Sequence, residues 1–131
     1  MIPSIERDFS KFVSFSFEDI CRRSLYSDNF LGLEKIGREW GKTREGAYEI
    51  DICGINEQTK TILFGECKWM DNVGSFKILD ELKSKSRCVS WNQDNRREYY
   101  AIFARSFSNK VNQKNVRLYD LEDIFRIFKN R

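Results

Sequence analysis

Hydrophobic residues recur along the chain at two spacings, which predict alternating helices and strands. Apolar side chains at helical spacing predict a helical segment over roughly the first 25 residues. The second apolar stripe of this segment comprises Phe17, Ile20, Cys21 and Leu25. Ser16 is the expected N-cap of that part. Glu18 would then lie in the first turn, where the helix dipole favours a carboxylate.

Three strand-like segments follow this helix. The segment LEKIGREW at 33–40 predicts a first strand, which the polar loop GKTREGA ends. The segments YEIDICGI at 48–55 and TILFGECKW at 61–69 are rich in β-branched and aromatic residues, and NEQTK separates them. They predict an antiparallel hairpin.

The second half of the chain predicts a helix, two strands and a final helix. The first of these helices starts near Ser75, and its apolar stripe is expected to comprise Phe76, Leu79, Leu82 and Val89. EYYAIFARSF at 98–107 and VRLY at 116–119 predict strands. In DLEDIFRIFKN, Asp120 is the expected N-cap with Asp123 three residues on. Its inward residues are expected to be Leu121, Ile124, Phe125 and Phe128.

The resulting order, α-β-β-β-α-β-β-α, predicts an α/β fold with a mixed central sheet flanked by helices. The length of 131 residues fits a single domain over residues 1–131. A net charge of +3 leaves the class of partner open, because nucleic-acid binding requires positive charge gathered on one face. The sequence has no apolar run long enough to cross a bilayer, and acids near the N-terminus argue against a signal peptide, so a cytoplasmic protein is expected.

The cysteine pattern argues against a zinc site. The four cysteines include no CxxC pair, and the sequence contains no histidine. If Asp51 and Glu66 share a face of the hairpin, strand alternation puts Cys53 on that face and Cys67 on the other. Free, mostly buried thiols in a reducing compartment are therefore expected.

The charged residues within the hairpin are the candidate chemistry. Asp51, Glu66 and Lys68 lie on otherwise apolar strands, where an ionised group is costly unless it is paired or coordinated. Two neighbouring carboxylates with only oxygen donors suit Mg²⁺ or Mn²⁺, with the Cys67 backbone carbonyl as a further ligand. Lys68 would orient a water or stabilise charge on a phosphate. The alternative is that Glu66 and Lys68 are solvated residues, and that Asp51 pairs with a nearby base such as Arg44 or Lys42.

The spacing of Asp51, Glu66 and Lys68 resembles that of the PD-(D/E)XK nuclease superfamily, the restriction-endonuclease-like fold of Holliday-junction resolvases and Mrr-type enzymes. FEDICRRSL, Trp40, EIDICGI, GECKW and VRLYDLEDI also resemble the domain of unknown function at the C-terminus of many archaeal-type P-loop ATPases. This resemblance covers nearly the whole chain. The proline of the superfamily motif is absent, because Glu49 and Ile50 precede Asp51.

The resemblance implies a Mg²⁺-dependent DNA endonuclease with Glu18, Asp51, Glu66 and Lys68 as its site residues. Glu18 would be an outer or second-metal ligand. It also implies a homodimer or an ATPase partner as alternatives, and a non-catalytic DNA- or partner-binding regulatory domain as the alternative function. No phosphate-binding loop occurs in the sequence, so the chain would be either a stand-alone relative or a fragment of a longer ATPase.

Basic residues and two tryptophans complete the candidate set. The basic positions are Arg22, Arg23, Lys83, Lys85, Arg87, Arg96 and Arg97, and they are expected to be either scattered surface charge or a phosphate track beside the acids. Trp69 and Trp91 are expected either in the core or stacked on a base.

Overall fold

Ten helices and strands follow one another along residues 17–129, the part of the chain that the computed structural model describes. They are α2 (Phe17–Asp28), β1 (Lys35–Thr43), β2 (Gly46–Asn56), β3 (Thr61–Lys68), β4 (Val73–Gly74), α3 (Ser75–Ser86), β5 (Arg97–Ala104), β6 (Phe107–Asn109), β7 (Val116–Tyr119) and α4 (Leu121–Lys129). The predicted order is confirmed over this part, with the short strand β4 and a separate short β6 as additions. The predicted N-cap Ser16 lies outside the described residues.

The main sheet has five strands in the order β1-β2-β3-β5-β7. The predicted hairpin is confirmed, since β2 and β3 pair antiparallel from Ile52 with Gly65 to Asn56 with Thr61. β1 also pairs antiparallel with β2, whereas β3, β5 and β7 run parallel. The predicted fold class, α/β with a mixed central sheet, is therefore confirmed.

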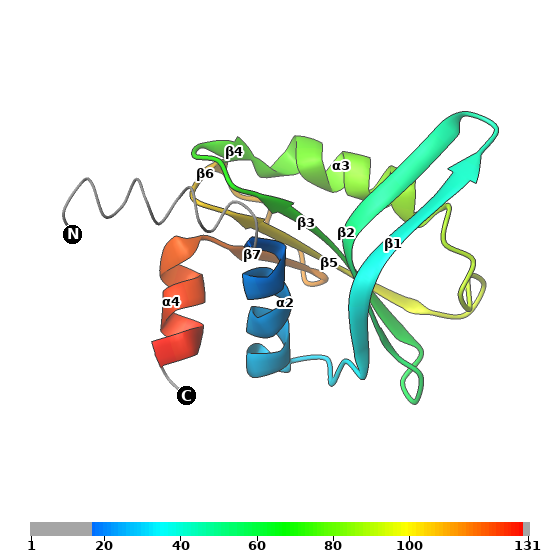
Figure 1. Cartoon of the computed structure of the whole chain (residues 1–131), viewed down its shortest axis with the longest axis horizontal. Helices are drawn as coiled ribbons and strands as arrows, with labels where there is room; N and C mark the ends of the chain where they lie inside the picture. Colours follow the sequence, from blue (N-terminus) through cyan, green and yellow to red (C-terminus); the bar gives the residue numbers. More distant parts are fainter. Residues whose placement is uncertain (1–16, 130–131) are drawn as a thin grey trace.

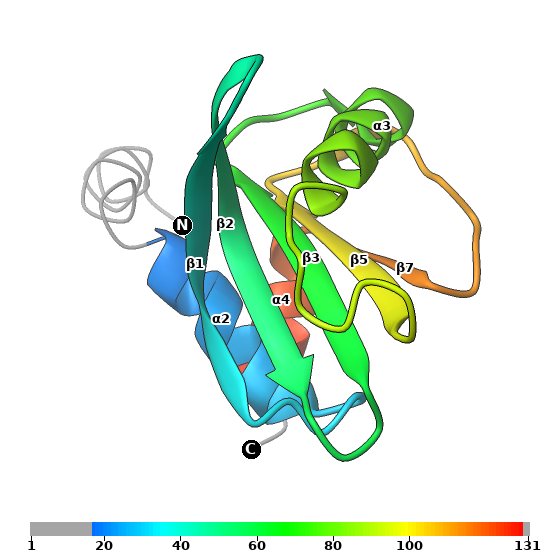
Figure 2. The same cartoon turned by 90° about the vertical axis from the view of Figure 1, so that its right-hand side faces the viewer.

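Helices cover both faces of this sheet, α2 and α4 on one face and α3 on the other (Figures 1 and 2). On the first face, Leu25 and Ile124 pack with Phe103 in what we call the α2–α4 cluster. On the second face, Leu82 packs with Ile102 in the α3 cluster. With both faces covered, a charged side chain within the sheet has little access to water, which raises the cost of any unpaired charge there.

Helix α4 begins with a reciprocal cap. The N–H of Asp123 donates to Oδ1 of Asp120 at 2.9 Å, and the N–H of Asp120 donates to Oδ2 of Asp123 at 3.0 Å. The expected N-cap is thus confirmed, with two otherwise unpaired amide groups satisfied. Ile124 is buried and Phe128 packs partly against the α2–α4 cluster, but Phe125 is exposed, so its predicted inward position is wrong.

Helix α3 departs from its predicted apolar stripe at both ends. Phe76 is exposed because the helix docks its first turn through Ser75, whose hydroxyl donates to the carbonyl of Asn109 at 2.9 Å. At the other end the helix stops at Ser86, so Val89 is buried from the following turn and not from the helix. The apolar pattern predicted that Phe76 and Val89 both belong to the inward stripe of the helix. Polar contacts at its first turn and its end after Ser86 make that prediction wrong for both residues.

The predicted strand over 98–107 is divided into β5 and β6. The N–H of Arg105 donates to the carbonyl of Met70 at 3.0 Å, and the N–H of Val73 donates to the carbonyl of Ser106 at 3.0 Å. These bonds draw the chain away from the main sheet, and β6 pairs with β4 in a separate two-stranded ladder.

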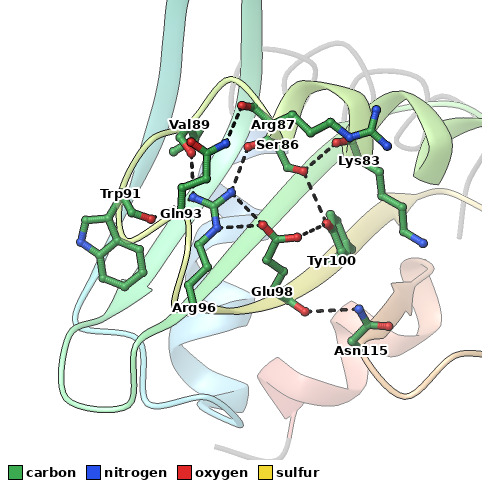
Figure 3. A network of polar contacts seen from close by, with 10 residues as sticks. All are labelled: Lys83, Ser86, Arg87, Val89, Trp91, Gln93, Arg96, Glu98, Tyr100 and Asn115. Atoms are coloured by element: carbon green, nitrogen blue, oxygen red, sulfur yellow. Dashed lines mark hydrogen bonds and ion pairs between the residues drawn. The ribbon is translucent and has the colours of Figure 1, made fainter.

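A buried arginine fixes the end of α3 to β5. The Arg96 side chain is only 2% exposed, and its guanidinium donates to Glu98 as well as to the carbonyls of Ser86, Val89 and Trp91 (Figure 3). These five hydrogen-bond and ion-pair contacts match the five N–H donors of the group. Arg96 is therefore a structural anchor, and its interpretation as surface charge or phosphate track is wrong.

Among the described residues, no helix combines the length and apolar character needed to cross a membrane.

Candidate metal and phosphate site

The site begins at an irregularity in β2. Gly37 pairs with Cys53 and Glu39 pairs with Ile50, so two steps along β1 match three along β2. The extra residue makes a β-bulge at Asp51 and Ile52. Ile50 accordingly belongs to the α3 cluster while Ile52 belongs to the α2–α4 cluster and Cys53 packs again on the α3 side.

Because of the bulge, the side chains of β2 do not alternate strictly between the two faces of the sheet, contrary to the expectation from the sequence. Cys53 and Cys67 do pack against opposite clusters, as predicted. The four cysteines are free, as expected. Cys21 is buried and Cys53 and Cys67 are half-buried, but Cys88 is exposed, so the expectation of buried thiols is wrong for Cys88. Bulges re-aim side chains, and this one lies at the residue that the sequence singles out, Asp51.

The Asp51 carboxylate takes the place of strand pairing. The β2–β3 ladder ends at Ile52 and Gly65, and beyond it the N–H of Cys67 donates to Oδ2 of Asp51 at 2.9 Å. In a strand the N–H and C=O of one residue point to the same side, so the Cys67 carbonyl also faces the space that β2 vacates. Asp51 does not pair with Arg44 or Lys42 within the described residues, which rules out that alternative there.

Gly65 permits this close approach just before Glu66. A Cβ atom on Gly65 would lie 3.1 Å from the Cβ of Ile52 and 3.3 Å from the carbonyl oxygen of Ala101. A side chain there would require Ile52 or Ala101, on the two neighbouring strands, to move by a few tenths of an ångström.

Glu66 is a buried carboxylate with a lysine partner. Its side chain is 7% exposed, and Oε1 lies 2.9 Å from Nζ of Lys85 on α3. The pKa of Glu66 is raised to about 7, chiefly by burial and next by the charge of Asp51, with Lys85 opposing the shift. Glu66 is therefore not a solvated surface residue, which contradicts the alternative interpretation of this position.

Glu18 approaches from the other face of the sheet, on α2. It forms an ion pair with Arg38 of β1, which also contacts Glu49 at 3.0 Å. Glu18 and Arg38 line a surface hollow of about 420 Å³ together with Cys67 and Trp69. Cys67, one of the lining residues, is also the residue whose N–H binds Asp51.

Lys68 lies at the end of β3 and is half-buried. Within residues 17–129 it has no ion-pair partner, in contrast to Lys85. The sequence predicted Lys68 as the cation of the site and left Lys85 among scattered charges. Lys85 follows the buried Leu82 by three positions on the helix, and this spacing is the signal that places it beside the sheet.

The donor set fits a divalent cation in part. The contacts with Cys67 and Lys85 occupy one oxygen of Asp51 and one of Glu66, which leaves the second oxygen of each for a metal. The two carboxylates and the Cys67 carbonyl are hard oxygen donors of the kind that Mg²⁺ and Mn²⁺ prefer. Glu18 does not fit while Arg38 holds it. Within the part of the chain described, no three acidic or cysteine side chains already form a metal cage.

Of the remaining basic candidates, Arg22 lies beside Glu18, and the others lie elsewhere on the molecule. Arg22 contacts Glu18 at 3.6 Å, and Lys83 lies over the ring of Tyr100, whereas Arg23, Arg87 and Arg97 are exposed. Trp69 packs on Phe17 at 4.9 Å between ring centroids, and both Trp69 and Trp91 pack against a core cluster, so the core interpretation is the one that fits them.

Comparisons with known proteins identify a family without an assigned activity. The chain is 33% identical over 129 residues to the uncharacterised protein MJECL04 of Methanocaldococcus jannaschii. The match covers 93% of this chain but only 28% of that relative. No solved structure gives a significant match.

A family model described as archaeal and bacterial proteins of unknown function matches residues 1–86. The matched segment holds Glu18, Asp51, Glu66, Lys68 and Lys85, and it covers 86 of the 131 residues. The chain therefore belongs to this family, the domain of unknown function 234.

Proposed function

We propose that this domain is a Mg²⁺-dependent endonuclease of the PD-(D/E)XK type that hydrolyses DNA phosphodiester bonds. The observation that carries the proposal is the meeting of Asp51 and Glu66 where β2 and β3 separate, close enough for Asp51 to raise the pKa of Glu66. Repulsion between two such acids destabilises the protein unless a cation lies with them, and a divalent ion meets that need.

Each residue of the site then has a distinct task. Mg²⁺ or Mn²⁺, when bound, would polarise a phosphate oxygen and lower the pKa of a water. Asp51 and Glu66 would hold the ion with the Cys67 carbonyl, and the Cys67 N–H fixes the orientation of Asp51. Lys68, which has no ion-pair partner among the described residues, would stabilise charge on the reacting phosphate. Glu18 would join as an outer ligand only after release from Arg38.

DNA is the proposed substrate, and the hairpin of β1 and β2 supports this choice. The hairpin projects past the neighbouring strands (Figure 2), and Trp40 on it is 69% exposed. Arg38, two residues away, belongs both to this hairpin and to the Glu18 ion pair. An exposed aromatic ring beside basic residues is suited to stack on an unpaired base, and Lys42 lies on the same side of β1 as Trp40.

The test is a cleavage assay on labelled duplex, single-stranded and branched DNA with Mg²⁺ or Mn²⁺. Wild type is compared with Asp51→Asn, Lys68→Ala and the exposed control Glu57→Gln. We expect metal-dependent cutting by wild type and Glu57→Gln, and its loss in the other two. No cutting by folded wild type, together with no metal binding in calorimetry, would refute the proposal.

The second candidate is a non-catalytic DNA- or partner-binding regulatory domain of an archaeal-type ATPase. The ion pairs of Glu18 with Arg38 and of Glu66 with Lys85 favour it, since they satisfy these acids without a metal. The chain also spans only 28% of the relative MJECL04, which leaves room in that protein for further domains. Under this function DNA or the partner binds equally well with and without Mg²⁺.

A further inference from the structure

Lys85 occupies a position that neither the nuclease motif nor the proposed roles assign. Its ammonium group lies 2.9 Å from Oε1 of Glu66, which is a proposed metal ligand. Lys85 lies on α3, whereas Glu66 lies on β3, and 19 positions separate the two residues in the sequence. The contact therefore depends on how α3 is seated on the sheet.

Hydrogen bonds fasten the C-terminal end of α3 to its surroundings. Ser86, the next residue, has its carbonyl bound by Arg96 at 3.0 Å and its hydroxyl donating to the carbonyl of Lys83 at 2.6 Å (Figure 3). The helix backbone at Lys85 is thus held in place. The side chain itself is 34% exposed, so its ammonium group can leave Glu66 for solvent without moving the helix.

A lysine ammonium and a divalent cation repel each other when they bind the same carboxylate. With the ammonium on Oε1 of Glu66, a metal on the other oxygen would bring two positive centres within a few ångströms, where repulsion in a half-buried setting is strong. A metal on Glu66 therefore weakens the ion pair with Lys85, and that ion pair weakens metal binding. The neighbouring Asp51 adds a second negative charge, which favours the divalent ion over the single charge of lysine.

We propose that Lys85 is the built-in counter-ion of Glu66 in the metal-free protein and that the divalent cation displaces it. The freed ammonium group then lies at the rim of the site, in reach of a bound phosphate group. Lys85 is on this view a positioning residue for the metal site. The inference rests on the metal site of the proposed function, but it does not require that the protein cut DNA.

The first test measures Mn²⁺ binding by calorimetry on wild type, Lys85→Met and Lys83→Met. We expect Lys85→Met to bind Mn²⁺ about tenfold more tightly than wild type, because the competing cation is gone. The matched control Lys83→Met, on the same helix but over Tyr100, should bind as wild type does. Weaker or unchanged binding by Lys85→Met overturns the inference while leaving the metal site itself in place.

The second test needs no variant and guards against a poorly folded one. Wild type is treated with an amine-acetylating reagent with and without Mn²⁺, and mass spectrometry reports the modification of each lysine. We expect the reactivity of Lys85 to rise several-fold with Mn²⁺, and that of the exposed Lys77 to stay constant. Constant reactivity of Lys85, or absence of Mn²⁺ binding in wild type, overturns the inference.

The two proposals fail in different ways. Mn²⁺ binding with release of Lys85 but no DNA cleavage supports the counter-ion and refutes the nuclease. DNA cleavage with Lys85 still protected at saturating Mn²⁺ supports the nuclease and refutes the counter-ion.

Discussion

The backbone N–H of Cys67 donates a 2.9 Å hydrogen bond to Oδ2 of Asp51 at the point where the β2–β3 ladder has ended. The Asp51 side chain thus accepts the hydrogen bond that a paired strand would otherwise accept, and it places a carboxylate between β2 and β3. Structural and chemical roles of Asp51 therefore overlap, and substitutions that separate charge from hydrogen bonding distinguish them.

Asp51→Asn and Asp51→Ala are expected to differ in stability but not in activity. Asparagine keeps an oxygen for the Cys67 N–H, whereas alanine leaves that buried donor unpaired at a cost of about 1–3 kcal/mol. Both variants lose the charge and should lose cleavage by about 100-fold or more. Urea unfolding and the DNA assay measure the two effects. Equal stability of the two variants would mean that water replaces the lost acceptor.

Because the pKa of Glu66 is raised in the folded protein, we expect the metal-free protein to lose stability as the pH rises. Its pKa in the folded protein is raised to about 7, so between pH 4.5 and 7 the folded state binds more protons than the unfolded state. The contribution of Glu66 to the free energy of unfolding is fully present below pH 4.5 and is lost above pH 7. Its size is on the order of 3 kcal/mol. Urea unfolding at several pH values in a chelator measures it.

The control for this pH dependence is Glu66→Gln, which is neutral at every pH. This variant should show a flatter stability profile between pH 4.5 and 7 than wild type does. An equally steep profile would assign the effect to another group, such as Asp123, whose pKa burial also raises.

Arg96→Lys is expected to destabilise the protein strongly although it keeps the charge. Lysine can still meet Glu98, but it cannot also reach the three carbonyls that the guanidinium binds (Figure 3). Losing a buried arginine of this kind costs on the order of 3 kcal/mol. Thermal unfolding measures the loss, with the exposed neighbour Arg97→Lys as the matched control. A loss as small as that of the control would mean that the network reforms around lysine.

Much of the fold follows from local patterns. The hairpin of β2 and β3 and the cap of α4 depend on residues close together in the sequence, so alternation and the Asp120–Asp123 spacing predict them. The inward face of α3 does not, because hydrogen bonds between Ser75 and Asn109 turn Phe76 outward. Ser75 and Asn109 are 34 positions apart in the sequence, so the spacing of apolar residues along the helix cannot predict their contact.

The candidate site divides in the same way. Asp51 and Glu66 stand out in the sequence because acids are rare on apolar strands, but the cations that pair with Glu18 and Glu66 come from other elements of the chain. Arg38 reaches Glu18 across 20 residues, and Lys85 reaches Glu66 across 19. The bulge at Asp51 depends on how β1 pairs with β2, so strict alternation missed it. Long-range pairing of charges is what the sequence does not predict.

Trp40→Ala is expected to weaken DNA binding with little effect on the fold. The ring is 69% exposed, so its removal should change stability by no more than about 0.5 kcal/mol. If the ring stacks on a base, the loss of about 1–3 kcal/mol weakens DNA binding by roughly tenfold or more. Fluorescence anisotropy with labelled single-stranded DNA measures the change at fixed salt, with the exposed Phe76→Ala on α3 as the matched control. If both variants bind DNA as wild type does, the β1–β2 hairpin is not the DNA contact, and the exposed tryptophan is left for a protein partner.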